Sequence, residues 1–265
     1  MLIDVHAHFY QPAGARADWA ERNASRLKAG ATIGITRHVA SILGTWGRTS
    51  PTYFPSPADV CAGNDALLAL MAQHPRLISG YACVNPNYTD HALNEIARCL
   101  AAGMIGIKLA ASRRADDPLV DPVAQAGARH RVPILHHVWQ HRRREWPGQE
   151  ASDGVELVRL ARRHPGSAFI LAHIGGGGEW THTLAAARRV DNVYIDLSGS
   201  GVDRGMLEAC INAVGPTRLL WGCDITMCTG WAKLRRLERI LSPADYDCVC
   251  WRNAAAIFPA GAFDQ

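Results

Sequence analysis

Residues 104–135 read MIGIKLAASRRADDPLVDPVAQAGARHRVPIL. The runs 104–109 and 132–135 are short and nearly continuously apolar, which is typical of parallel strands that are covered on both faces. Residues 122–131, between them, favour a helix that begins beside Asp121 and Pro122. The stretch therefore predicts a strand, a crossover helix and a second parallel strand.

The same alternation continues along the whole chain. Its 265 residues give about 33 residues for each of eight units, the size of a strand, a helix and two loops. The predicted strands are 2–5, 32–42, 77–84, 104–109, 132–135, 168–172, 193–197 and 218–222, and the clearest helices are 58–73, 90–102, 122–131, 154–164, 203–214 and 231–241. We therefore expect an α/β fold in which residues 1–265 form one (β/α)₈ TIM barrel rather than an open doubly wound sheet.

Composition excludes several classes of protein. With 48% hydrophobic and 20% charged residues, the chain is neither disordered, collagen-like nor a coiled coil. The net charge of +4 comes with no basic stripe and no nucleic-acid motif, so we expect no nucleic-acid partner. We see no apolar run of about 18 residues and no signal-peptide pattern, so we expect no membrane partner and a cytoplasmic location. The eight cysteines are dispersed, as in reduced buried thiols.

Ligand-type side chains stand where the predicted strands end. His6 and His8 are separated by one residue, so in an extended strand both rings project on the same side. Because the carboxyl ends of barrel strands meet at one mouth, polar residues that close later strands can join them there. These residues are Lys108, His136, His173 and Asp224. The pattern predicts a metal site at the carboxyl ends of the strands.

These residues lie in motifs that resemble the amidohydrolase superfamily, in particular its branch of amidohydrolase-2 hydrolases and aminocarboxymuconate-semialdehyde-type decarboxylases. The motifs are Asp4-Val5-His6-Ala7-His8, Gly106-Ile107-Lys108-Leu109, Ile134-Leu135-His136-His137-Val138-Trp139, Leu171-Ala172-His173-Ile174-Gly175-Gly176, Leu220-Trp221-Gly222-Cys223-Asp224 and the closing Asn253-Ala254-Ala255.

The resemblance implies a set of roles. His6, His8, His136 and Asp224 would bind one divalent metal ion, for which Zn²⁺ is preferred and Mn²⁺ is the alternative, while His173 would act as general acid or base. Three imidazoles and one carboxylate suit such an ion independently of the resemblance.

Two alternatives remain open at the metal site. Lys108 could be carboxylated and bridge a second metal ion, as in binuclear amidohydrolases, but its context favours one ion with the lysine facing the substrate. His137 lies beside His136, and neighbouring strand residues face opposite ways, so only one of them can easily address the mouth. We choose His136; a shift of one residue or a bulge would reverse that choice.

The expected function is a metal-dependent hydrolase that attacks an amide, ester or lactone carbonyl through a metal-activated water, with His173, Asp224 and Lys108 as catalytic residues. The alternative is a metal-dependent non-oxidative decarboxylase of a small aromatic or unsaturated carboxylic acid, and a non-catalytic scaffold is a third hypothesis. Arginines at 113, 114 and within 141–146 could favour an anionic small-molecule substrate. Trp46, Tyr53 and Phe54 could wall its pocket, and a homodimer is compatible with the helical surface.

Overall fold

The structure is a computed structural model, and it describes residues 1–138, 148, 150, 152–174, 179–201, 203–224 and 229–264. Eight strands form one sheet in sequence order, and every neighbouring pair is parallel. The strands are β1 (Ile3–His8), β2 (Arg37–Ser41), β3 (Ile78–Val84), β4 (Gly106–Leu109), β5 (Ile134–His137), β6 (Phe169–Ala172), β7 (Val193–Asp196) and β8 (Leu219–Leu220).

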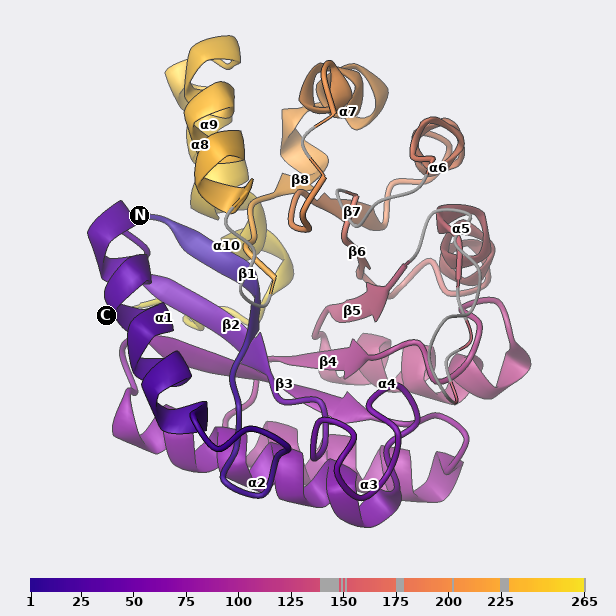
Figure 1. Cartoon of the computed structure of the whole chain (residues 1–265). Helices are drawn as coiled ribbons and strands as arrows, with labels where there is room; N and C mark the ends of the chain where they lie inside the picture. Colours follow the sequence, from indigo (N-terminus) through magenta and orange to yellow (C-terminus); the bar gives the residue numbers. More distant parts are fainter. Residues whose placement is uncertain are drawn as a thin grey trace.

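Helices follow the strands and lie outside them (Figure 1). They are α1 (Trp19–Ile33), α2 (Pro57–Gln73), α3 (Thr89–Ala101), α4 (Asp121–His130), α5 (Gly154–Arg163), α6 (Thr181–Ala187), α7 (Met206–Val214), α8 (Thr229–Ile240), α9 (Pro243–Asp247) and α10 (Asn253–Ile257), with 3₁₀ turns η1 (Pro118–Val120) and η2 (Pro216–Arg218) and the π-helical turn η3 (Cys248–Arg252). The predicted TIM barrel is confirmed.

Backbone hydrogen bonds close the ring between its first and last strands. The N–H of Val5 donates to the carbonyl oxygen of Trp221 (3.1 Å), and the N–H of Asp224 donates to that of His6 (2.7 Å). An isolated parallel bridge joins Ala7 to Asp224 in the same place. The segment after β8 therefore continues along β1, which brings two distant parts of the sequence to the same rim.

The buried apolar side chains form two main layers. The inner core fills the barrel, and the outer core fills the space between the strands and the helices. Residues of the inner core include Ile3, Val5, Val39, Tyr81, Leu135, Ile170, Ala172 and Leu220. Residues of the outer core include Ile107, Leu109, Ile134, Val138, Phe169, Leu171, Leu157 and Leu160. These two sets show which face of each strand points into the barrel.

Helices α1 and α6 were not among the clearest helices predicted from the sequence. Residues 11–30 lie outside every predicted helix and strand, yet α1 occupies most of that range. Its signal is weak because Asn23 and Gly30 are its buried residues, so little of its surface is apolar and inward-facing. Gly34, at φ 85°, ends this helix, so β2 begins at Arg37 and not at residue 32.

Among the described residues, no helix is both long and apolar enough to cross a membrane.

Candidate metal centre

A bulge in β1 turns its two histidines into the barrel. Val5 packs in the inner core, so regular alternation would point His6 to the other side. The pairing of β1 with β2 is irregular between Asp4 and Ala7, which shifts the alternation by one residue. His6 and His8 both become buried beside Asp224 at the carboxyl end of the strand.

The donor atoms of these three residues lie close together. His6 Nε2 is 3.1 Å from His8 Nε2, and the two nitrogens are 3.6 and 3.4 Å from Asp224 Oδ1. Within the described part of the chain they form the one group of at least three candidate ligands whose atoms all lie within 4.8 Å of one another. The structure thus brings together three of the four metal ligands expected from the sequence.

Hydrogen bonds at Nδ1 of His6 and of His8 determine the tautomer of each ring. His6 Nδ1 lies 2.7 Å from Asp196 Oδ2, and His8 Nδ1 lies 3.2 Å from the carbonyl oxygen of Ser41. A carboxylate and a carbonyl accept hydrogen bonds, so each Nδ1 carries the proton and each Nε2 presents a lone pair. Burial lowers the pKa of His6 and of His8 well below the usual value, so both rings are neutral near pH 7.

The spacing of these lone pairs fits a first-row divalent cation. Ligand atoms about 2.1 Å from one ion lie about 3.0 Å apart at a right angle and about 3.4 Å apart at the tetrahedral angle. Two of the observed separations, 3.1 and 3.4 Å, fall in this range, and the third, 3.6 Å, is slightly longer. Two imidazole nitrogens and a carboxylate oxygen this close together make a candidate metal site.

Lys108 and His173 stand beside this donor set. Lys108 Nζ is 3.1 Å from His6 Nε2, and His173 Nε2 is 3.5 Å from Asp224 Oδ2. Burial alone would raise the pKa of Asp224, but the positive charges of the imidazoles, when protonated, and of Lys108 hold it well below its usual range, so the carboxylate is ionised. Burial lowers the pKa of Lys108 to about 8, which leaves this cation largely charged at neutral pH.

On β5 the alternation of inner and outer residues favours His137 over His136, the residue chosen from the sequence. Leu135 belongs to the inner core, and Ile134 and Val138 belong to the outer core, so alternation turns His137 inward and His136 outward. The ring of His137 packs edge-on against that of His173, with centroids 4.8 Å apart. His136 instead places Nδ1 2.8 Å from the carbonyl oxygen of His137. Neither histidine belongs to the group of three donors, but His137 turns toward the inside of the barrel and His136 turns away from it.

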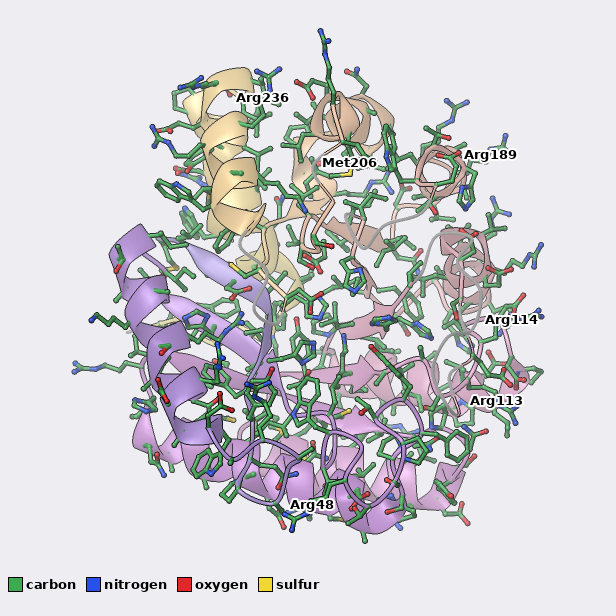
Figure 2. All side chains as sticks on the ribbon, in the orientation of Figure 1. Arg48, Arg113, Arg114, Arg189, Met206 and Arg236 are labelled. Carbon is green, nitrogen blue, oxygen red and sulfur yellow. The ribbon has the colours of Figure 1, made fainter. Side chains whose placement is uncertain are left out.

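Arg113 and Arg114, which the sequence suggested for anion binding, form ion pairs with carboxylates of the chain. Arg114 Nε is 2.6 Å from Asp116, and Arg113 lies 3.6 and 3.7 Å from Asp117 and Glu150. Figure 2 shows both arginines at the outer rim of the molecule, away from the middle of the ring of strands. They therefore do not support an anion site at the metal centre. The arginines within 141–146 lie outside the described residues.

Comparison with known proteins identifies the family. The family model described as Amidohydrolase matches residues 3–260. The chain belongs to the amidohydrolase family. A search of curated proteins finds no match to this amidohydrolase.

Solved structures share the fold of this amidohydrolase over nearly its whole length. 5-Carboxyvanillate decarboxylase from Sphingomonas paucimobilis is 18% identical, with 97% of this chain and 98% of the other covered and a TM-score of 0.71. Dihydroxybenzoic acid decarboxylase from Polaromonas sp. JS666, with bound manganese and the inhibitor 2-nitroresorcinol, is 17% identical, with 97% and 96% covered and a TM-score of 0.72. An amidohydrolase from Burkholderia multivorans is 17% identical, with 98% and 100% covered and a TM-score of 0.70.

Sequence reasoning missed the residues that support the ligands. Asp196 and Ser198 both approach His6 Nδ1, at 2.7 and 3.1 Å, and Ser41 Oγ lies 3.0 Å from His8 Nδ1. Asp196 closes β7, so the signal used for His173, a polar residue at the end of a barrel strand, could have found it. Burial raises the pKa of Asp196 to about 6, but its contacts with Ser198 favour the ionised form that holds His6.

Proposed function

We propose that this amidohydrolase is a metal-dependent, non-oxidative decarboxylase of a small aromatic or unsaturated carboxylic acid. The observation that carries the proposal is the position of His173, whose Nε2 lies 3.5 Å from Asp224 Oδ2 and whose ring stacks 5.7 Å from that of His6. A proton donor therefore adjoins the metal donors. Two of the structures that share the fold are decarboxylases of aromatic acids, which favours this function over the hydrolase expected first from the sequence.

The proposed metal ligands are His6, His8 and Asp224, with His137 as the fourth in place of His136. Mn²⁺ and Zn²⁺ both accept imidazole and carboxylate donors, and manganese is bound in the Polaromonas structure. A bound ion would act as a Lewis acid that holds a substrate oxygen and stabilises negative charge. A single ion accounts for the grouped donors, and Lys108 is then free to act on the substrate.

In this reaction, residues of the chain would attract the substrate carboxylate and donate the proton. The Lys108 ammonium group, fully buried beside His6, attracts the carboxylate of the substrate. When the carbon–carbon bond breaks, carbon dioxide leaves and the electron pair stays on the substrate carbon. His173 donates the proton that forms the new carbon–hydrogen bond, and solvent restores that proton for the next turnover. The overall change is R–CO₂⁻ plus H⁺ giving R–H plus CO₂.

A substrate panel tests the proposal directly. Protein loaded with Mn²⁺ or Zn²⁺ is incubated with 2,6-dihydroxybenzoate, 5-carboxyvanillate, an aryl lactone and an N-acyl amino acid, and both carbon dioxide and hydrolysis products are measured. We expect carbon dioxide from one of the carboxylic acids, at a rate that depends on the metal. Turnover of the lactone or the amide without release of carbon dioxide would show that the hydrolase hypothesis is the correct one.

A further inference from the structure

The loop between β2 and α2, residues 44–56, carries two aromatic side chains to the metal centre. The ring of Trp46 packs edge-on against His8, with centroids 5.7 Å apart, and the ring of Tyr53 lies 5.4 Å from that of His137. Burial and the negative charge of Asp224 raise the pKa of Tyr53 to about 12, so its hydroxyl stays protonated. Two flat rings from one loop therefore stand next to the residues that would hold the metal and the substrate.

A single buried carboxylate accepts several hydrogen bonds from this loop. Asp59, in the first turn of α2, is 6% exposed and accepts hydrogen bonds from the hydroxyls of Thr49 (2.5 Å), Thr45 (3.3 Å) and Ser50. Its backbone N–H donates to Ser56 Oγ (3.2 Å). The loop is thus wrapped around Asp59, and four of its hydroxyl-bearing residues contact that one residue.

The loop also lies against α2 at very short range. A methyl group at Gly63 would stand 3.1 Å from the backbone nitrogen of Gly44 and from the carbonyl oxygen of Ile42. Trp46 adopts a positive φ of 55°, a conformation that is unfavourable for a bulky residue and persists where its surroundings impose it. The hydrogen bonds to Asp59 and this close contact hold the loop around Trp46, whose Nε1 also donates to the carbonyl oxygen of Phe9 (3.3 Å).

We propose that Asp59 is a positioning residue for the substrate, acting through the loop to hold Trp46 and Tyr53 against the metal centre. In the described part of the chain, the hydrogen bonds of Asp59 are made with the loop, so we expect its effect to fall on the aromatic rings and not on the ion. The two rings then present a flat, mainly apolar surface to the ring or conjugated system of a bound acid. This step rests on the proposed decarboxylase function, whereas the anchoring of the loop does not.

The anchoring is tested without any substrate. Asp59→Ala is compared with Asp65→Ala, which removes an exposed carboxylate from the same helix, where it pairs with Arg98 at 2.7 Å. Amide hydrogen exchange in residues 44–56 should rise by tenfold or more in Asp59→Ala and stay unchanged in Asp65→Ala. The affinity for Mn²⁺ should stay within about twofold of wild type in both variants. Unchanged exchange in the loop would overturn the proposal, as would a loss of Mn²⁺ affinity that parallels the rise in exchange.

The effect on substrate is tested on the acid that the wild-type enzyme turns over. Asp59→Ala should raise KM by tenfold or more while kcat falls less. In the double variant Asp59→Ala/Tyr53→Ala, KM should rise by less than the product of the two single effects, because both changes act in part on the position of Tyr53. If the increase in KM of the double variant equals the product of the two single increases, Asp59 does not act through Tyr53. If Asp59→Ala does not fold, Thr49→Val, which removes one hydroxyl that donates to Asp59, should also increase hydrogen exchange in the loop. Thr49→Ser keeps this hydroxyl and should exchange at the wild-type rate.

The two proposals fail in different ways. If the wild type decarboxylates no acid and does not bind 2-nitroresorcinol, the proposed function is wrong, and the exchange data still decide whether Asp59 anchors the loop. If the wild type is active and KM is unchanged in Asp59→Ala, the positioning role is wrong and the proposed function stands.

Discussion

The backbone N–H of Asp224 donates a 2.7 Å hydrogen bond to the carbonyl oxygen of His6, which joins the first and last metal-site residues directly. The buried carboxylate of Asp4 reinforces this link, because its Oδ1 accepts hydrogen bonds from the N–H of His6 (3.2 Å) and of Cys223 (2.9 Å). Asp224 itself has a φ of 60°, in the left-handed region. Packing of the two segments thus sets the separation of the donor atoms.

Asp4→Asn should weaken metal binding without removing a ligand. Its Oδ2 is held by Arg26 and by His38, each at 3.0 Å, and an amide nitrogen cannot replace an acceptor that faces these donors. We expect the affinity for Mn²⁺ to fall by about 10- to 100-fold, as for other residues that orient metal ligands. Titration against a competing chelator measures this change. Asp191→Asn, on the surface, is the control, and equal affinities for the two variants would show that Asp4 does not orient the site.

His137→Asn and His136→Asn should differ in metal content. His137 faces the donor set, so its loss should lower the affinity for Mn²⁺ by at least about 100-fold, beyond the usual effect of a supporting residue. His136→Asn should retain affinity within a few-fold, since His136 turns away from the site. Metal analysis after dialysis of both proteins makes the comparison. The opposite ranking would restore the choice made from the sequence.

His173→Asn should separate catalysis from metal binding. We expect the metal content per chain to stay at the wild-type value and kcat to fall by about 10²- to 10⁴-fold, the usual contribution of general acid–base catalysis. Single-turnover measurements of carbon dioxide release, together with metal analysis of the same sample, provide both numbers. A fall from two ions per chain to one would instead assign His173 to a second metal site and revive the binuclear alternative with Lys108.

Removal of the metal should abolish turnover and lower stability. An ion that binds the folded chain alone stabilises it by about 2.7 kcal/mol when its free concentration is 100 times Kd. The melting temperature should therefore fall after chelation and rise again when Mn²⁺ or Zn²⁺ is added, in step with activity. His6→Ala serves as the matched control, because its melting temperature should respond little to either ion. Full activity in metal-depleted protein would be incompatible with the proposed function.

Glu95 should contribute to acid stability far from the site. Hydrogen bonds from Arg98, at 2.7 and 2.8 Å, lower the pKa of Glu95 to about 2 from 4.5. A carboxyl group whose pKa is depressed by folding stabilises the protein above its unfolded pKa, and this stabilisation is lost as the pH falls from about 4.5 to about 2. Glu95→Gln should therefore lower stability at pH 7 and flatten its decline over that range.

Urea unfolding at several pH values measures this dependence. Glu238→Gln, which removes an exposed helical carboxylate, is the control and should leave the slope as in wild type. Parallel curves for Glu95→Gln and wild type would show that the pair with Arg98 is not coupled to folding.

Much of the fold could be predicted because strands and crossover helices have local signals. Strands β3 to β5 are three short apolar runs, and each is followed by a stretch that favours a helix. Helix α1 escaped prediction because few of its side chains face the core, so its periodicity is faint. The metal-site residues could be placed at strand ends, but not oriented, because one bulge or one residue of register reverses which side chain faces inward.

The sequence by itself determined the barrel and the rim at which His6, His8, Lys108, His173 and Asp224 meet, because both follow from where apolar runs end. Only the tertiary structure decided that β1 bulges, that His137 and not His136 turns inward, and that residues 44–56 wrap around Asp59. These features depend on contacts between segments that are distant in sequence or on the alternation of a single strand. Such contacts cannot be read from the local sequence, because they form only when the strands and helices pack around the closed barrel.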